Sequence, residues 1–208
     1  MIGVFITARL GSTRLNEKHL IEINAKPLIR YLVERFLVAF KESIEGKKIK
    51  IFITTSIKPE NKKFESIFDA NEVEVYYGSD ENIPLRHLEC AIEHDIDYIV
   101  SIDGDDILCS TEASKLVMDR LLSGSKMAYT EGLPLGMNST GYSKGFLKRS
   151  LKGIESKKLQ TGWGKIFDEN EIDIIQLKYS DKVKKIRMTL DYTADVEFFK
   201  SVITNVNV

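Results

Sequence analysis

The chain has 208 residues, and its 30 lysines and arginines nearly cancel its 31 aspartates and glutamates. This length is enough to bury a substantial core, so we expect a single domain over residues 1–208. The balanced charge argues against a nucleic-acid-binding surface. No apolar run approaches the roughly 20 residues that a membrane span needs, and the N-terminus lacks the pattern of a cleavable leader. We therefore expect a cytoplasmic protein with neither a membrane nor a nucleic acid as its partner.

The first half of the chain alternates between two hydrophobic periods. Apolar, β-rich runs predict four strands, at residues 2–8, 49–54, 73–76 and 97–102. Amphipathic runs predict four helices, at residues 28–40, 59–70, 84–94 and 111–122. Alternation of this kind indicates an α/β fold with a mostly parallel sheet, in which ligands bind beyond the carboxyl ends of the strands.

The second half is less regular. We expect strands or an extended flap, a short helix, two further strands and a closing helix, at residues 126–140, 143–151, 172–179, 185–190 and 193–203. Residues 126–180 are expected to form an irregular substrate and dimerisation subregion within the same domain.

A basic loop leaves the end of the first predicted strand. It carries Arg9, Arg14 and Lys18, with Gly11 and Ser12 between them. Guanidinium and ammonium groups bind phosphate oxygens, and a glycine at positive φ brings backbone N–H groups close to a phosphate. The loop is neither a Walker A loop nor a GxGxxG turn. It predicts an anion site, with a solvated basic loop as the alternative.

Carboxylates cluster at two other points. Asp103, Asp105 and Asp106 follow the strand at 97–102, and Asp191 and Asp195 precede the last helix. Crowded carboxylates repel one another unless a cation lies between them, and Mg²⁺ prefers oxygen ligands. The alternatives are a polar turn at the first cluster and a helix N-cap at the second.

The basic loop resembles the N-terminal signature of the sugar-acid cytidylyltransferases, A-R-x-x-S-[ST]-R-[LF]-P-G-K, and residues 26–29 match a K-P-L-I segment of the same family. That family includes CMP-Kdo synthetases, acylneuraminate cytidylyltransferases and a spore-coat polysaccharide branch, which this sequence resembles most. The resemblance implies one Rossmann-like, GT-A-like nucleotide-diphospho-sugar transferase domain, a homodimer, and Mg²⁺ as the cofactor.

The resemblance also implies roles for individual residues. Arg14, Lys18 and Asp105 would be catalytic, and Asp105 and Asp191 would hold the metal. The predicted nucleotide-binding residues are Ala8, Arg9, Gly11, Ser12, Arg14, Lys18, Thr55, Ser79, Arg86 and Asp103. The sequence departs from the family at Asn16 and Glu17, which replace Pro-Gly. We expect Glu17 to pair with Lys18 and weaken its hold on phosphate.

Four residues are predicted to contact the sugar. Asn138 and Thr140 stand where the spore-coat branch has acidic residues in a P-x-G-x-D-x-E segment. Trp163, the only tryptophan, would stack on the sugar, and Lys165 would meet its carboxylate. The alternative for Trp163 is a buried anchor.

These features predict a Mg²⁺-dependent nucleotidyltransferase that transfers CMP from CTP, or another NTP, to an acidic sugar for surface polysaccharide biosynthesis. One alternative is a nucleotide-sugar-dependent glycosyltransferase, because residues 103–105 form a D-x-D sequence. Its product would be a nucleoside diphosphate in place of pyrophosphate. The other alternative is a degenerate member that binds nucleotide without turnover.

Overall fold

The computed structural model describes residues 1–154, 158–179 and 181–206. Its strands are β1 (Ile2–Thr7), β2 (Glu22–Ile23), β3 (Lys26–Pro27), β4 (Ile49–Ser56), β5 (Val73–Gly78), β6 (Tyr98–Asp103), β7 (Met127–Glu131), β8 (Thr140–Ser143) and β9 (Ile172–Gln176). Its α-helices are α1 (Leu28–Ala39), α2 (Lys41–Glu45), α3 (Ile83–Glu93), α4 (Thr111–Leu122), α5 (Lys144–Leu151), α6 (Asp181–Lys184) and α7 (Thr193–Asn205). None of the described helices is long and apolar enough to cross a membrane.

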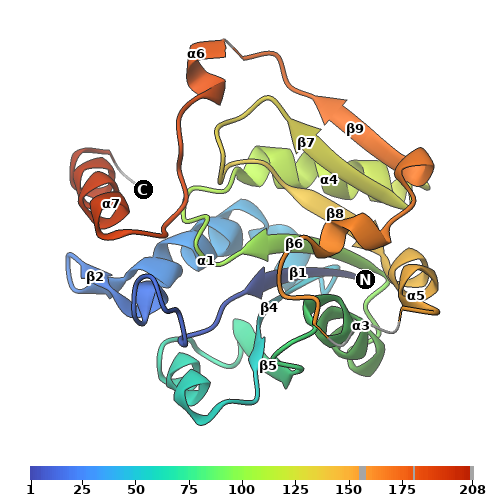
Figure 1. Cartoon of the computed structure of the whole chain (residues 1–208), viewed down its shortest axis with the longest axis horizontal. Coiled ribbons are helices and arrows are strands. Elements are labelled where there is room, and N and C mark those ends of the chain that lie inside the picture. Colours follow the sequence, from blue (N-terminus) through green and yellow to red (C-terminus); the bar gives the residue numbers. More distant parts are fainter. Residues whose placement is uncertain (155–157, 180, 207–208) are drawn as a thin grey trace.

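A seven-stranded sheet forms the centre of the molecule, with strand order β5-β4-β1-β6-β8-β7-β9 (Figure 1). Strands β5, β4, β1 and β6 are parallel to one another, and β9 is parallel to β7. Strand β8 is antiparallel to both of its neighbours, β6 and β7. The prediction of an α/β fold with a mostly parallel sheet is therefore confirmed.

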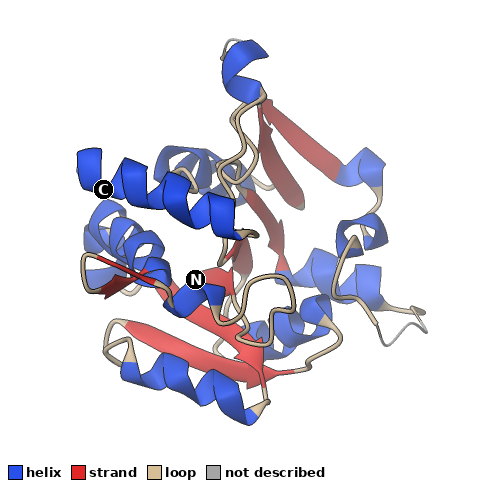
Figure 2. Cartoon of the chain, turned by 60° about the vertical axis from the view of Figure 1, so that its left-hand side comes forward, coloured by secondary structure: helices blue, strands red, loops and turns tan. Residues whose placement is uncertain are grey.

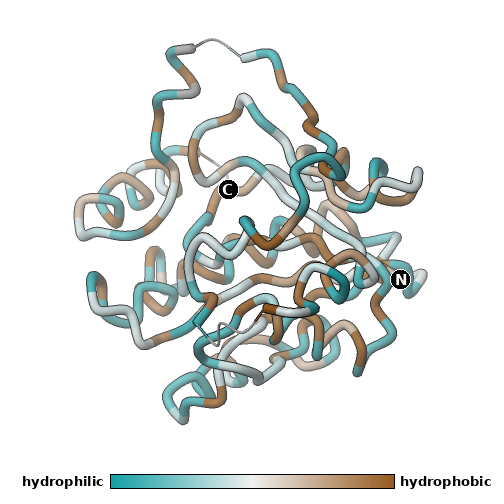
Figure 3. Tube along the Cα trace, turned by 45° about the vertical axis from the view of Figure 1, so that its right-hand side comes forward, coloured by the Kyte–Doolittle hydropathy of each residue, from teal (hydrophilic) through white to brown (hydrophobic). Residues whose placement is uncertain are grey.

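Helices cover both faces of this sheet (Figure 2). Val4 of β1 packs in one core with Ile29 of α1 and Val117 of α4. Phe5, the next residue, packs in a second core with Leu88 of α3. Successive strand residues point to opposite faces, so a strand covered on both sides is apolar throughout. Figure 3 shows these apolar stretches along the central strands and hydrophilic stretches in the outer turns.

Two predicted elements are wrong. Residues 59–70 were expected to form an α-helix, but the structure has a 3₁₀ helix over Pro59–Ser66, in which only Asn61 and Phe64 are buried. Two buried residues are too few for the apolar stripe of an amphipathic helix. Residues 185–190 form no strand, and a single bridge joins Leu135 to Arg187.

The fold brings three strand ends together. Thr7, at the end of β1, is in register with Thr54 of β4 on one side and with Asp103 of β6 on the other. The chain runs from β1 to β4 and β5 in one direction and then crosses to β6 beyond β1. Such a reversal of strand order opens the crevice in which α/β sheets bind ligands.

Candidate active site

Lys18 lies at the centre of the predicted triphosphate site. Its side chain is buried, with the residue only 7% exposed. The Nζ atom lies 2.5 Å from Oδ2 of Asp105 and 3.2 Å from Oδ1 of Asp191. The structure thus brings one predicted phosphate-binding cation and both predicted metal ligands together, although 87 and 173 residues separate them in sequence.

Asp191 is surrounded by cations. Arg14 contacts its Oδ1 atom at 2.8 Å, and Arg187 donates a hydrogen bond to Oδ2 at 2.7 Å. Burial alone raises the pKa of Asp191, but the hydrogen bonds from Arg187 and Lys18 outweigh burial, and the net pKa lies below the usual aspartate value. Asp191 is therefore ionised at neutral pH.

Backbone hydrogen bonds hold the two predicted metal ligands in place. The N–H of Leu190 donates to the carbonyl of Asp105 at 2.9 Å, which fixes the segment before Asp191 against the loop after β6. Asp195 accepts from the N–H groups of Asp191 and Tyr192, both at 2.8 Å. Asp195 therefore has a structural role, as its place in the first turn of α7 suggests.

Glu17 does not make the predicted ion pair with Lys18, and its backbone conformation bears on the glycine that the resembling family has at this position. Its carboxylate pairs with Lys63 at 2.5 Å, so it does not hold Lys18. Its backbone is left-handed, with φ 47° and ψ 34°. This conformation favours glycine, which is the residue that the resembling family has there. Glutamate at this position therefore affects the backbone conformation and the local charge, and it is not a partner of Lys18.

We expect Glu17→Gly to raise the affinity for CTP several-fold, because it removes a negative charge beside the predicted triphosphate site. The free energy of unfolding should change by less than about 1 kcal/mol. Glycine relieves the strain of the left-handed backbone, but the substitution removes a surface ion pair and makes the unfolded chain more flexible. Titration calorimetry with CTP and thermal unfolding measure the two effects. Glu17→Gln is the control that removes the charge and keeps the side chain; unchanged CTP affinity in both variants would contradict the expectation.

Gly11 does not take the positive φ expected of it. Its loop is held instead by Asn61, whose Oδ1 accepts from the N–H of Leu10 at 2.9 Å and whose Nδ2 donates to the carbonyl of Ser56 at 3.0 Å. Asn61 lies in the 3₁₀ helix after β4, so it ties the loops after β1 and β4 together.

The other predicted nucleotide-binding residues of this loop are Ala8, Arg9 and Ser12, and their contacts with a nucleotide remain a prediction. Ala8 is buried, Ser12 accepts a hydrogen bond from the N–H of Leu15, and Arg9 is exposed. Nη1 of Arg9 donates to Oε1 of Gln160 at 3.2 Å, and Nε2 of Gln160 donates to the carbonyl of Asp80 at 3.1 Å. Gln160 therefore bridges the loops after β1 and β5.

Arg86 lies behind the end of β4. It is only 2% exposed, and its Nη1 donates to the carbonyl of Thr54 at 3.0 Å. Burial lowers its pKa to about 10, so it stays charged. The Nε atom of Arg86 and the Oγ1 atom of Thr55 are buried without a hydrogen-bond partner among the described residues. Ser79 accepts from the N–H of Asn82 at 3.1 Å. That these residues face the nucleotide remains a prediction.

Two buried histidines position the strand ends. Burial lowers the pKa of His19 to about 4 and that of His87 to about 3, so both rings are neutral at pH 7. Nδ1 of His19 donates to the carbonyl of Gly104 at 3.1 Å. A Cβ atom on Gly104 would lie 2.9 Å from the Cβ of Ala8, so only glycine allows this close approach. His87 Nε2 bonds the hydroxyl of Thr7 at 2.9 Å.

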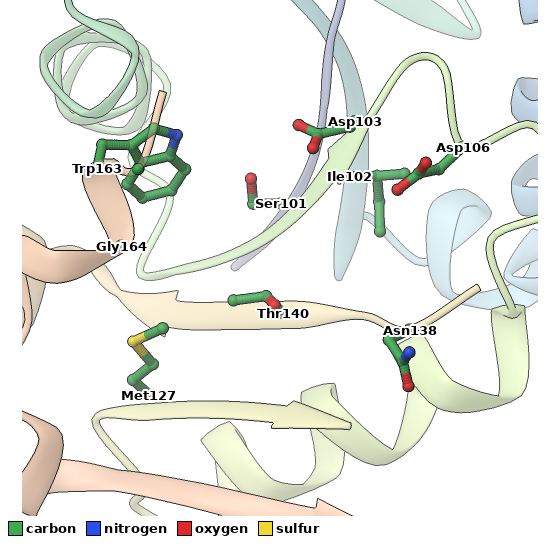
Figure 4. Close-up of a pocket in the computed structure, with 10 residues that line it drawn as sticks. Ser101, Ile102, Asp103, Asp106, Met127, Asn138, Thr140, Trp163 and Gly164 are labelled. Atoms are coloured by element: carbon green, nitrogen blue, oxygen red, sulfur yellow. The ribbon is translucent and has the colours of Figure 1, made fainter. Parts of the chain in front are cut away.

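A cavity of about 320 Å³ opens beside these strand ends, with β6, β7 and β8 contributing to its wall (Figure 4). It is lined by Ser101, Ile102, Asp103, Asp106, Met127, Asn138, Thr140, Gly162, Trp163 and Gly164. Three of the four predicted sugar-contacting residues therefore meet one predicted nucleotide-binding residue, Asp103, in a single hollow. Lys165 is exposed and is not among the lining residues.

Asn138 and Trp163 have structural contacts as well as a place in the cavity wall. Nδ2 of Asn138 donates to the carbonyl of Leu133 at 3.1 Å, which shapes the loop before β8. The ring of Trp163 packs edge-on against His87 and Tyr142, with centroids 5.9 and 5.8 Å apart. Trp163 is thus both an anchor and a lining residue, and the two interpretations of its role are compatible.

The two cavity carboxyl groups have raised pKa values. Burial raises the pKa of Asp103 to about 6, and the charge of Asp105 adds to this. Burial raises the pKa of Asp106 to about 8, with further contributions from Asp103 and Asp105. A cation near these carboxyl groups would lower both pKa values.

Sequence analysis missed four residues that the structure places at the site: His19, Asn61, Gln160 and Arg187. His19 sits beside Lys18, and Arg187 stands four residues before Asp191, so both were near residues already selected. Asn61 and Gln160 make contacts across 51 and 151 residues of sequence. No local pattern marks such contacts.

The α/β fold with a seven-stranded, mostly parallel sheet is typical of nucleotidyltransferases. The chain matches the cytidylyltransferase family over residues 4–171. It belongs to this family. A relative, an uncharacterised protein of Methanocaldococcus jannaschii, is 27% identical over 96% of this chain and 81% of its own length.

Solved structures share the fold. A cytidylyltransferase from Leptospira borgpetersenii has a TM-score of 0.83 and 23% identity, over 99% of this chain and 87% of that one. A CMP:2-keto-3-deoxy-manno-octonic acid synthetase complexed with CTP has a TM-score of 0.72 and 14% identity, over 98% of each chain. A Mycobacterium tuberculosis protein in complex with manganese has a TM-score of 0.63 and 11% identity, over 96% of this chain and 97% of that one.

Proposed function

We propose that this cytidylyltransferase transfers CMP from CTP to an acidic sugar, with release of pyrophosphate, in the synthesis of a surface polysaccharide. The observation that carries the proposal is the meeting of Arg14 and Lys18 with Asp105 and Asp191 beside a polar cavity. Cations for a triphosphate, carboxylates for a metal and a space for an acceptor thus lie side by side. The CTP complex of a protein with this fold supports the choice of nucleotide.

The carboxylates suit a divalent ion. Oxygens of Asp105 and Asp191 converge on one point, where the ammonium of Lys18 lies. Among the described residues, no group of three or more His, Cys, Asp or Glu side chains has a metal-holding arrangement. Mg²⁺ is commonly bound through one or two carboxylates together with substrate phosphates and water. We therefore propose that Asp105 and Asp191 hold Mg²⁺ jointly with the nucleotide, as the manganese complex of a protein with this fold suggests.

In the proposed reaction, an acceptor hydroxyl in the cavity attacks the α-phosphorus of CTP. The new bond joins the acceptor oxygen to that phosphorus, the hydroxyl proton passes to water, and the bond to the β-phosphate oxygen breaks as pyrophosphate leaves. Arg14 and Lys18 hold the departing phosphates, and a bound Mg²⁺ would neutralise the charge that develops on them. Asn138 and Thr140 would orient the acceptor by hydrogen bonds, and Trp163 would exclude water from one side.

The acidic nature of the sugar rests on the sequence resemblance. Neither lysine nor arginine occurs among the ten residues that line the cavity, and two of the ten are aspartates. Lys165, the expected partner of the sugar carboxylate, is exposed outside them. A panel of acceptors must therefore contain neutral sugars matched to each acidic one.

A second candidate is a member that binds CTP without turnover. The observation that favours it is Glu17, a charged residue in a left-handed conformation beside the basic loop. Such a protein would bind nucleotide and be stabilised by it, yet release no pyrophosphate with any acceptor.

The deciding experiment measures pyrophosphate release with Mg²⁺ for each of the four NTPs and the acceptor panel. We expect release with CTP and an acidic sugar only. Release of a nucleoside diphosphate from a nucleotide sugar would instead identify a glycosyltransferase. CTP-dependent thermal stabilisation without pyrophosphate release would identify the binding-only member.

A further inference from the structure

Arg187 has so far been described only as a partner of Asp191. It lies on the irregular segment before α7, where the N–H of Met188 donates to the carbonyl of Leu135 at 2.7 Å and holds the backbone. Nη2 of Arg187 lies 2.7 Å from Oδ2 of Asp191 and 3.4 Å from Oδ2 of Asp195. Its side chain is 37% exposed, so the guanidinium remains open to solvent while it touches a predicted metal ligand.

Both oxygens of Asp191 are occupied by cations. Arg14 and Lys18 contact Oδ1, and Arg187 contacts Oδ2. These contacts use three of the roughly four lone-pair sites of the carboxylate, and their positive charges repel a divalent ion that approaches it. Arg187 has a second carboxylate partner of its own in Asp195 and is partly exposed, so it can leave Asp191 without losing all compensation of its charge.

Arg187 and Arg14 form a matched pair. Their Cζ atoms lie 5.7 and 5.6 Å from the centroid of the Tyr192 ring, within the range of a cation–π contact. Both guanidinium groups contact the same aromatic ring and the same carboxylate, and both side chains are partly exposed, so N–H donors remain for a ligand. Guanidinium N–H groups in such an arrangement bind phosphate oxygens in pairs.

The charges of the cluster balance without a ligand. Three cations (Arg14, Lys18 and Arg187) face three carboxylates (Asp105, Asp191 and Asp195). A triphosphate brings new anionic partners for the cations. Each cation that turns to phosphate frees a carboxylate oxygen for a metal ion.

We propose that Arg187 is a third cation of the triphosphate site, and that Asp191 exchanges Arg187 for the divalent ion when the nucleotide binds. The inference rests on the proposed function and deepens it. The ion and the nucleotide then each bind weakly alone and more tightly together, because each removes the competitor of the other. Such coupling between two ligands is reciprocal.

The test uses Arg187→Met, which keeps the length of the side chain and removes its charge. Binding of CTP is measured by calorimetry in EDTA, and binding of Mn²⁺ without nucleotide is measured from the electron paramagnetic resonance signal of the free ion. We expect the dissociation constant of CTP to rise about tenfold, because one charged hydrogen bond to the nucleotide is lost. The dissociation constant of Mn²⁺ should fall several-fold.

Arg149→Met is the matched control. Arg149 pairs with Glu171 at 2.6 Å on the surface of α5, and its side chain is 53% exposed. Arg149→Met should change neither the dissociation constant of CTP nor that of Mn²⁺.

Arg187→Lys is a second variant, which keeps the charge and should retain most of the CTP affinity. A thermal unfolding midpoint near that of the wild type shows that each variant is folded.

The outcomes separate this inference from the proposed function. If the wild type binds CTP and Arg187→Met binds it equally well, Arg187 is not a triphosphate residue. If Arg187→Met loses CTP affinity while Mn²⁺ binding is unchanged or weaker, the exchange at Asp191 is wrong. A wild type that binds no nucleotide contradicts the proposed function itself.

Discussion

Replacement of Asp105 by asparagine is expected to lower the turnover number about a thousandfold, the size of effect seen when one electrostatic contact to the transition state is lost. The amide fills the same space but cannot neutralise a divalent ion. Lys18 keeps its second partner, Asp191, at 3.2 Å, so the buried ammonium does not lose all compensation. The variant should therefore remain folded, with the same secondary structure by circular dichroism and a clear unfolding transition.

Pyrophosphate release under saturating CTP and acceptor measures the effect. Asp119→Asn is the matched control, because Asp119 pairs with Lys115 at 3.0 Å on an exposed face of α4. It should leave turnover unchanged. A variant at Asp105 that keeps wild-type turnover would show that this carboxylate is no metal ligand.

Replacement of Gly136 by alanine should lower the free energy of unfolding by about 3 kcal/mol, from backbone strain and overpacking together. Gly136 has φ +89°, and an added Cβ would lie 2.2 Å from the carbonyl oxygen of Met188 and 3.0 Å from Oδ1 of Asp106. The clash is with backbone, which no rotamer change relieves. Because Met188 lies on the segment that leads to Asp191, the change should also displace a predicted metal ligand.

Urea unfolding gives the free energy, and nucleotide binding gives the effect on the site. Gly145→Ala is the control: no atom lies within 4 Å of its added Cβ, and it lies in α5, where alanine is favoured over glycine. Gly145→Ala should be neutral or stabilising. A loss below about 1 kcal/mol in Gly136→Ala would show that the loop before β8 yields easily at this contact.

Much of the fold could be predicted from sequence because its signals are local. Strands β1, β4 and β6 are mostly apolar, since helices cover both faces, and α1, α3 and α4 have regular apolar stripes. Residues 185–190 misled the prediction because Ile186, Met188 and Leu190 alternate as in a strand. Their neighbour is the loop around Gly136, whose positive φ is incompatible with a regular ladder, so only one bridge forms.

Many residues of the candidate site could be predicted from sequence, but the contacts that they make with one another could not. Sequence indicated that Arg14, Lys18, Asp105 and Asp191 would share a site, since residues at strand ends and one family pattern pointed to them. It could not show that Lys18 is the buried cation. Nor could it show that Glu17 pairs with Lys63, because that ion pair depends on how the 3₁₀ helix after β4 packs beside the loop after β1.

Strand β8 is the one strand of the central sheet that runs against its two neighbours. Its first residue, Thr140, is therefore in register with Ser101 near the end of β6, and the loop before it opens at the edge where the basic loop also lies (Figure 1). The loop before β8, which contributes to the cavity wall, and the basic loop after β1 are separate segments attached to the same central sheet. Substitutions at Asn138 and Thr140 can therefore reshape the cavity wall without contacting Lys18, whereas Gly136, on the same loop as Asn138, is held against the segment that leads to Asp191.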